Sequence, residues 1–274
     1  MLTRTTCALV SLFFATLTHT KDAQTPFAIM LNGTTSCGKT SISWALANLS
    51  SKPMLMTGCD KCWAMIPRSK LADWFEFVPG KDEEGKETAH WIPTPQLGQK
   101  LYDAAPKIAR LLVDQGFNVI IDEVILDDRA LKMYADALEG IPVYFVGVHC
   151  SLGALEEREK LRCDRPLGLA RRQLPLVHSS TRHYDIQIST EHKEPADCAK
   201  EILDFVDNNP HPTGLAQCRQ QLATFNTPLE IASPESTHDT PAQTAHELHE
   251  GGPIAITPSG KENKPADGSR FPSF

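Results

Sequence analysis

The sequence predicts an α/β fold: a five-stranded parallel sheet with helices on both faces and a lid segment that carries arginines. Two observations predict it. Five short, mostly apolar runs alternate with helical segments, the pattern of right-handed β-α-β units that build parallel sheets. A glycine-rich loop directly follows the first run and precedes a helix. Ligands of such sheets bind at the carboxyl ends of the strands, so the loop marks the expected site.

The elements follow in order along the chain. Strands are expected at 27–31, 54–57, 117–122, 141–148 and 184–188. The first is a continuous apolar run, typical of a strand buried on both faces, whereas the last is more polar and is expected nearer an edge. Helices are expected at 41–47, from Asp60, at 97–115 and from Leu152, with Gly116 ending the third. The stretch 78–90 is interpreted as a polar, glycine-bearing connection.

The glycine-rich loop is a complete phosphate-binding motif. Its two glycines let the backbone curl so that successive N–H groups and the helix N-terminus face one anion. Lys39 is expected to reach the β- and γ-phosphates of a nucleotide, and the Thr40 hydroxyl to ligate magnesium. A chance match in an ordinary glycine turn is the alternative, which the flanking strand and helix disfavour. The predicted nucleotide-binding residues are Gly33, Thr34, Thr35, Ser36, Cys37, Gly38, Lys39, Thr40 and Ser41.

The end of another predicted strand carries two carboxylates and belongs with the loop. The strand through Ile120 and Ile121 ends in Asp122 and Glu123. A carboxylate at such a strand tip helps to hold hydrated magnesium. Aspartate is also common at the ends of buried strands because it favours turns. Beside a phosphate-binding loop, however, Asp122 becomes the favoured partner of Thr40 for magnesium.

Asp60 is the candidate base. It lies just past the second strand, at the same edge of the sheet as the loop. From there its carboxylate could take a proton from a hydroxyl that attacks the γ-phosphorus. Aspartate is also frequent as a helix cap, and Asp60 precedes a short predicted helix. Spacing alone leaves both roles open.

Arginines gather after the helix that begins at Leu152. They are Arg158, Arg162, Arg165, Arg171 and Arg172. Some are expected to pair with Glu156, Glu157 and Glu159. Because Pro166 and Gly168 break the segment, the cluster also suits a lid that excludes water and neutralises the charge of a transferring phosphoryl group.

Composition excludes few functions. The chain has 274 residues, 41% of them hydrophobic, and a formal net charge of −7. These values are ordinary for a globular protein and give no general field that attracts nucleic acid or an anionic membrane. No nucleic-acid partner is therefore predicted, and the sequence does not indicate an oligomeric state.

Three regions are expected along the chain. Residues 1–22 combine Arg4 with an apolar run and resemble a secretory signal peptide, with a disordered leader as the alternative; the run is too short to span a bilayer comfortably. Residues 23–208 form the phosphate-binding domain. Residues 209–274 lack apolar periodicity and are expected to be a flexible tail. A requirement for ATP favours the cytoplasm, while the leader leaves export open.

The eight cysteines show no compact framework of paired spacings. Cys59 and Cys62 have the C-x-x-C spacing of a redox or zinc site, but no second pair completes a metal site, so ordinary thiols are favoured. Cys37 is close to a helix N-terminus and to Lys39. We therefore expect its thiol to have a lowered pKa and to be oxidisable.

The full set of motifs resembles the chloramphenicol phosphotransferases. The resemblance includes Ser36-Cys37-Gly38-Lys39-Thr40 and Gly58-Cys59-Asp60, and extends in order and approximate spacing from about 28 to 206. The other matching segments are 29–33, 64–67, 120–124, 146–150, 158–159, 164–165, 177–178, 184–185 and 190–194. Cys37 replaces an expected alanine, and 68–99 is only loosely similar.

This resemblance implies a P-loop kinase fold related to shikimate and adenylate kinases, with ATP and magnesium as cofactors. It also implies Asp60 as the base that activates a primary hydroxyl, and Arg165 as a lid arginine. The predicted function is ATP-dependent transfer of the γ-phosphate to a small hydroxylated substrate, similar to chloramphenicol 3-O-phosphotransfer and hence to antibiotic resistance. Asp60, Lys39, Arg162 and Arg165 are the predicted catalytic residues.

Two other classes of function remain open at this point. A toxin-type kinase that phosphorylates a nucleotide sugar would use the same loop and aspartate. An exported, noncatalytic nucleotide-binding protein would bind ATP without transferring phosphate.

Overall fold

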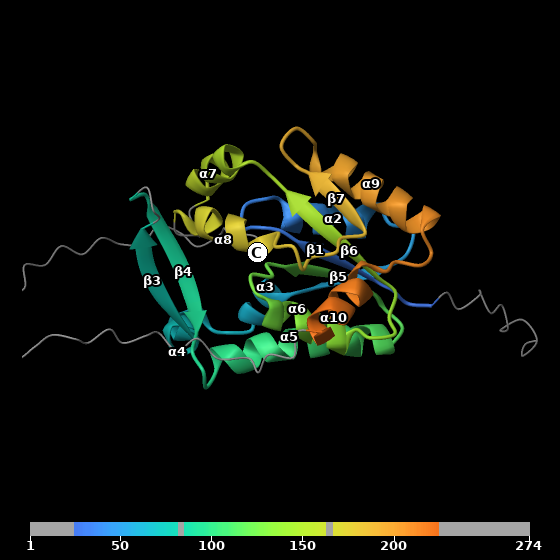
Figure 1. The fold of residues 1–274 in the computed structure, drawn as a ribbon, viewed down its shortest axis with the longest axis horizontal. Helices are drawn as coiled ribbons and strands as arrows, with labels where there is room; N and C mark the ends of the chain where they lie inside the picture. The colour runs from blue at the N-terminus through green and yellow to red at the C-terminus, as the bar shows by residue number, and fades with distance from the viewer. Residues whose placement is uncertain (1–24, 82–84, 163–166, 225–274) are drawn as a thin grey trace, which may run out of the picture. The chain divides into compact units, whose positions relative to one another are not determined.

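The computed structural model describes residues 25–81, 85–162 and 167–224 of the chain, and Figure 1 shows its ribbon. The main sheet is built from β1 (Ala28–Asn32), β2 (Met54–Thr57), β5 (Asn118–Glu123), β6 (Val143–His149) and β7 (Ile186–Ser189). The helices are α2 (Lys39–Leu49), α3 (Cys59–Trp63), α4 (Leu71–Trp74), α5 (Gly98–Asp114), α6 (Asp128–Ala137), α7 (Leu152–Lys160), α8 (Leu169–Val177), α9 (Pro195–Asn208) and α10 (Gly214–Thr224). A 3-10 turn, Arg68–Lys70, precedes α4, and two further strands, β3 (Phe75–Lys81) and β4 (Glu87–Pro93), form a separate hairpin.

The predicted five-stranded parallel sheet is confirmed. Its strand order is β2-β5-β1-β6-β7, and every neighbouring pair is parallel. β1 is central, with Ala28 in register with Val119 of β5 and Val143 of β6. The more polar β7 lies at an edge, as its composition predicts. The carboxyl end of β1 therefore opens between two neighbours, where the phosphate-binding loop begins.

Helices cover both faces of the sheet because β1 alternates between two cores. Ala28 and Met30 pack with α5, α6 and α10, whereas Ile29 and Leu31 pack with α2, α7, α8 and α9. All four side chains are fully buried. This two-residue alternation is the geometry of a strand that is covered on both sides.

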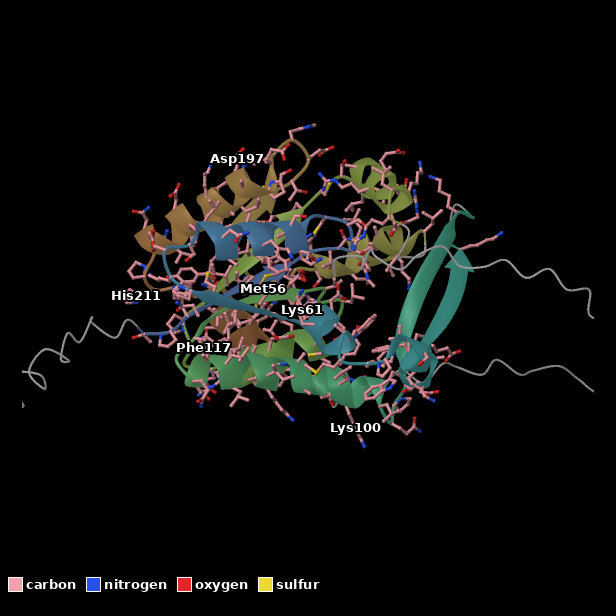
Figure 2. The ribbon with its side chains drawn as sticks, turned by 180° about the vertical axis from the view of Figure 1, so that it is seen from behind. Met56, Lys61, Lys100, Phe117, Asp197 and His211 are labelled. Atoms are coloured by element: carbon pink, nitrogen blue, oxygen red, sulfur yellow. The ribbon has the colours of Figure 1, made fainter. Side chains whose placement is uncertain are left out.

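Helix α5 corresponds to the helix predicted at 97–115, and its amphipathic pattern explains which face packs against the sheet. Ala105, Ala109 and Val113 are buried against the sheet, whereas Lys100 points away from it, as Figure 2 shows from behind. The Gly116 amide donates to the Val113 carbonyl at 2.9 Å with a φ of 90°, a conformation that favours glycine at a helix end. The predicted end of this helix is confirmed.

The connection expected at 78–90 is instead largely the antiparallel hairpin of β3 and β4. The register pairs Phe75 with Pro93 and Lys81 with Glu87. Pro79 and Gly80 lie inside β3 and hid the strand pattern from the sequence. In a two-stranded ribbon both strands are edges, where proline is tolerated.

The folded part also extends beyond the predicted limit at residue 208. Helix α10 lies within the range 209–274 that was expected to be a tail, and it buries Leu215, Cys218 and Leu222 beside α6 and β6. The leader 1–22 and residues 225–274 lie outside the described residues. Within the ranges that the structure describes, no helix has both the length and the apolarity needed to cross a bilayer.

Candidate functional site

The phosphate-binding loop requires its glycines. Gly38 has a φ of 100° and caps the N-terminus of α2, a left-handed conformation that disfavours any side chain. At Gly33, a Cβ atom would lie 2.5 Å from the Val148 carbonyl oxygen and 2.7 Å from Cys37 Sγ. Gly33 therefore allows close packing, and Gly38 allows the turn into the helix.

Lys39, Thr40 and Asp122 lie together, as the sequence predicts. The Thr40 hydroxyl donates to Asp122 Oδ2 at 2.6 Å. Lys39 Nζ donates to the Thr34 carbonyl at 2.8 Å and lies 3.9 Å from Asp122 Oδ1. Lys39 is nearly fully buried. A buried ammonium, a hydroxyl and a carboxylate thus share the mouth of the loop.

Asp60 lines the same cavity as the loop. This cavity measures about 710 Å³ and is lined by Lys39, Thr40, Asp60, Asp122 and Arg162, among others. Volumes of this order are typical of sites for small ligands. The structure therefore brings together those of the predicted catalytic and magnesium residues that it describes.

The helix that carries Asp60 is capped by another residue. Asp60 is the second residue of α3, and Gly58 is its N-cap. The capping role that the sequence left open for Asp60 is therefore not the one observed. Instead the Cys59 amide, at the first position of α3, donates to Glu123 Oε1 at 2.7 Å.

Glu123 is a buried carboxylate that sequence reasoning did not assign to the site. It is 3% exposed and also accepts a hydrogen bond from the Tyr134 hydroxyl. Burial raises the pKa of Glu123 to about 7, although the hydrogen bonds from Tyr134 and Cys59 oppose the rise. Its place beside Asp122 in the strand-end motif was the only signal that could have pointed to it.

Gly58 allows the chain before Asp60 to touch β5. It has a φ of 132°, and a Cβ atom there would lie 2.1 Å from the Asp122 carbonyl oxygen. We expect Gly58→Ala to lower the free energy of unfolding by about 3–5 kcal/mol, because a clash with backbone adds to the conformational strain. Denaturant titration measures the loss.

Gly140→Ala is the matched control for that substitution. Its φ is 79°, and nothing lies within 4 Å of a Cβ placed there. Only backbone strain of about 1–2 kcal/mol is expected. Equal losses in the two variants would mean that contact with Asp122 is not the reason for glycine at position 58.

The arginines of the expected lid have different roles. Arg158 Nη2 donates to the Thr190 carbonyl at 2.7 Å, and Nη1 donates to the Thr190 hydroxyl at 2.9 Å. The Thr190 hydroxyl in turn donates to the Cys37 carbonyl at 2.7 Å. Arg158 therefore braces the loop. Arg171 pairs with Glu156, whereas Arg162 lines the cavity. Arg165 lies outside the described residues.

Two side chains attach α8 to its surroundings: Glu159, which the sequence offered as a partner for the arginines, and Gln173, which it did not single out. Glu159 is fully buried and accepts the Gly168 and Ala170 amides at 2.7 and 2.9 Å. Gln173 Oε1 accepts the Thr35 amide at 2.7 Å. Helix α8 is thus fixed both to the arginine segment and to the phosphate-binding loop.

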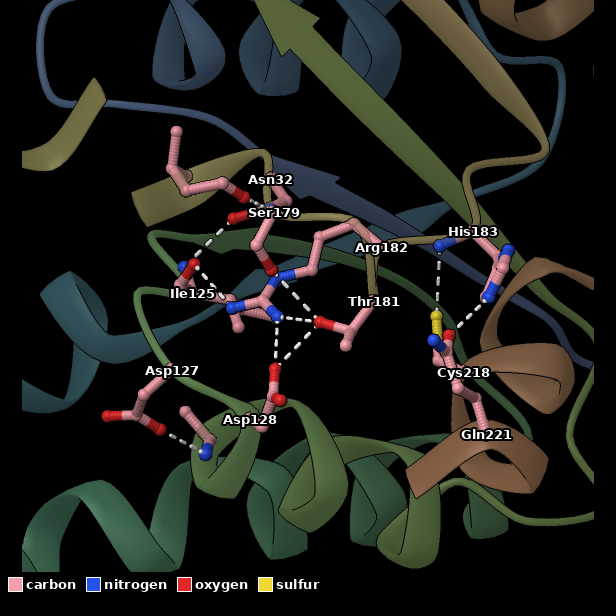
Figure 3. Close-up of polar contacts among 12 residues, drawn as sticks. Asn32, Ile125, Asp127, Asp128, Ser179, Thr181, Arg182, His183, Cys218 and Gln221 are labelled. Carbon is pink, nitrogen blue, oxygen red and sulfur yellow. Dashed lines mark hydrogen bonds and ion pairs between the residues drawn. The ribbon is translucent and has the colours of Figure 1, made fainter. Parts of the chain in front are cut away.

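A polar network fixes the turn that follows β5. Asn32 Oδ1 accepts the Ile125 amide at 2.8 Å, and its Nδ2 donates to the Val177 carbonyl at 3.0 Å. The buried Arg182 side chain donates to Asp128 Oδ1 at 2.5 Å and to the Ile125 carbonyl at 3.4 Å (Figure 3). Although Arg182 Nε has no hydrogen-bond partner among the described residues, the other hydrogen bonds tie the turn after Glu123 to β1, α6 and α8.

The expectation of a low pKa for Cys37 is wrong. Its thiol is fully buried, and burial raises the pKa of Cys37, outweighing the opposing charge of Lys39. Cys59 and Cys62 are free thiols whose pKa values are also raised by burial. Proximity to a lysine could be predicted from sequence, whereas the loss of hydration could not.

We expect Cys37 to resist alkylation in the folded protein. Brief treatment with iodoacetamide near neutral pH, followed by peptide mass mapping, should label the half-buried Cys150 before Cys37. Labelling of Cys37 ahead of Cys150 would show that its thiolate is accessible after all.

Comparison with known proteins gives one family match and several relatives. Residues 27–207, more than half of the chain, match the family of chloramphenicol phosphotransferase-like proteins. A protein from Mycobacterium tuberculosis strain H37Rv, named "Putative O-phosphotransferase Rv2636", is 28% identical over 199 residues, which cover 70% of this chain and 88% of that protein.

Solved structures show weaker similarity. A sugar kinase from Janibacter sp. HTCC2649 is 17% identical, covering 68% of this chain and 96% of its own, with a TM-score of 0.46. The shikimate kinase from Acinetobacter baumannii, in complex with shikimate, is 14% identical with the same coverage and a TM-score of 0.44.

Proposed function

The chain belongs to the chloramphenicol phosphotransferase-like family, and on that premise we propose that it transfers the γ-phosphate of ATP to a hydroxyl of chloramphenicol or a related compound, with Asp60 as general base. Family membership makes it an ATP-dependent phosphotransferase that acts on a small hydroxylated molecule. The proposal adds the acceptor and the residue roles. The observation that carries it is the single cavity lined by Lys39, Thr40, Asp122 and Asp60.

Each of these residues has a role in the proposal. The Asp60 carboxylate takes the proton of the attacking hydroxyl, which makes the oxygen a better nucleophile. Lys39 and the loop amides bind the phosphate oxygens of ATP. Because these donors are held in place, they stabilise the negative charge that develops on the phosphoryl group during transfer. Arg162 and Arg165 are proposed to neutralise the migrating charge.

Thr40 and Asp122 are the proposed magnesium residues. The two oxygens are 2.6 Å apart at the mouth of the loop, and hydroxyl and carboxylate oxygens are the donors that magnesium accepts. Magnesium would shield phosphate charge there.

A transfer assay tests the proposal. The purified chain is incubated with ATP, magnesium and chloramphenicol or a panel of related hydroxylated compounds, and mass spectrometry detects the product. We expect at least one compound to gain the mass of one phosphate group, with one ADP formed for each product. Binding of ATP without transfer to any compound would instead favour the noncatalytic alternative.

A further inference from the structure

The phosphate-binding loop contains a turn that its own residues do not favour. Ser36 has a φ of 61°, in the left-handed region, and among the described residues it is the only one other than glycine with a positive φ. Its hydroxyl is buried and has no hydrogen-bond partner among the described residues, so the side chain does not stabilise the turn. Strained backbone of this kind persists where the surrounding structure imposes it.

The peptide groups on both sides of Ser36 are held by side chains from outside the loop. On one side, the Thr35 amide donates to Gln173 Oε1 at 2.7 Å. On the other side, the Cys37 carbonyl accepts the Thr190 hydroxyl at 2.7 Å. The strained residue therefore lies between two external hydrogen bonds, one of which comes from α8.

The hydrogen bond from α8 is shielded from water, because both Gln173 and Thr35 are buried. Breaking a buried hydrogen bond by removing one partner costs the desolvation of the group that remains. If the Gln173 acceptor were removed, the Thr35 amide could turn toward water only by moving the loop. The bond thus opposes a change in loop conformation.

Helix α8 is itself anchored at both ends. At its start, the buried Glu159 carboxylate accepts two backbone amides, a favourable place for a negative charge because of the helix dipole. Glu159 lies on α7, which packs beside α8 (Figure 1). At its end, the Val177 carbonyl accepts Asn32 Nδ2 at 3.0 Å. Gln173 therefore reaches the loop from a helix whose position is fixed.

Helix α8 does not form the wall of the nucleotide cavity. Among the described residues that line the cavity of about 710 Å³, none belongs to α8, whereas Arg158 and Thr190 do line it. Substitution of Arg158 or Thr190 would mix a lost contact to the nucleotide with a change in the loop. Gln173 allows the second effect to be measured alone.

We propose that Gln173 is a positioning residue for the nucleotide: from α8 it holds the Thr35–Ser36 turn in the conformation that binds phosphate, and so sets the affinity for ATP without contacting it. The inference rests on the proposed function, because it requires that the loop binds a nucleotide, and it deepens that function. Without this hydrogen bond, a smaller fraction of molecules has a binding-competent loop. The apparent Kd rises as the inverse of that fraction.

Gln173→Leu tests the proposal, since leucine is of similar size but cannot accept a hydrogen bond. We expect the Kd for ADP with magnesium, measured by titration calorimetry without acceptor, to rise about tenfold. KM for ATP should rise with it. At saturating ATP, kcat should change less than about twofold, because the bound nucleotide itself holds the loop in place. Wild-type Kd and KM in this variant would overturn the proposal.

Gln221→Leu is the matched control. It removes the same group from α10, where the Gln221 side chain pairs with His183 Nε2 at 2.6 Å. Thermal unfolding is measured for both variants. We expect both to lower Tm and only Gln173→Leu to weaken ADP binding. Equal weakening in the two variants would reflect a general loss of stability and would reject a positioning role.

Hydrogen exchange without nucleotide separates this inference from the proposed function. The peptide that contains Thr35 should exchange at least about threefold faster in Gln173→Leu than in the wild type, and at the wild-type rate in Gln221→Leu. Faster exchange and weaker ADP binding in a protein that phosphorylates no compound of the panel would reject the function and retain the positioning role. Unchanged exchange and binding in an active enzyme would do the reverse.

Discussion

Asp60→Asn is expected to lower kcat about 10²- to 10⁴-fold while ATP still binds, because the amide keeps the size of the carboxylate but cannot accept the proton of the attacking hydroxyl. The Cys59 amide and Glu123 hold the helix that carries this residue, so the substitution should leave the geometry of α3 intact. Steady-state rates of product formation and an equilibrium titration with ATP measure the two effects separately.

The control for that variant removes a carboxylate elsewhere. Asp114 lies at the end of α5 and pairs with Arg110, and Asp114→Asn should leave kcat unchanged. If Asp60→Asn kept full turnover, the base would have to be another group. If it lost ATP binding as well, Asp60 would have a role in organising the loop rather than in proton transfer.

Lys39→Met should lower kcat/KM for ATP about 10³-fold or more. Methionine keeps much of the length of the side chain but removes the charge that faces the phosphates. It also leaves Asp122 without the ammonium that lies 3.9 Å from it, so weaker nucleotide binding is expected together with slower transfer. Titration with ATP and initial rates at varied ATP concentration distinguish the two contributions.

Lys52→Met is the control for the loss of a lysine. Lys52 lies over the Phe27 ring, 5.2 Å from its centroid, and is absent from the cavity lining. Its loss should not alter kcat/KM. Wild-type kinetics in Lys39→Met would contradict nucleotide binding by the loop in the manner proposed.

Local patterns were sufficient to predict the centre of the fold and the mouth of the loop. The run 27–31 is apolar at every position, which is typical of a strand covered on both sides. Thr40 and Asp122 are 82 residues apart, yet they could be paired because each belongs to a motif with a known place at the same edge of a parallel sheet.

Other parts depend on contacts that no local pattern announces. The bond from the Thr35 amide to Gln173 spans 138 residues, and the bond from the Cys59 amide to Glu123 spans 64. Gln173 belongs to no motif, and the strand-end motif that contains Glu123 does not indicate the Cys59 amide as its partner. The hairpin of β3 and β4 was missed for a different reason: Pro79 and Gly80 normally break a strand, and only the absence of a second neighbour makes them acceptable here.

Helix α10 has a practical consequence for anyone who shortens this chain. Ending it at residue 208 would uncover apolar side chains of α6 and β6, the two elements against which α10 packs. Water would then contact an apolar surface on α6, the helix that carries Tyr134, and exposed apolar surfaces promote aggregation. Truncated versions intended for crystallisation should therefore retain everything up to Thr224.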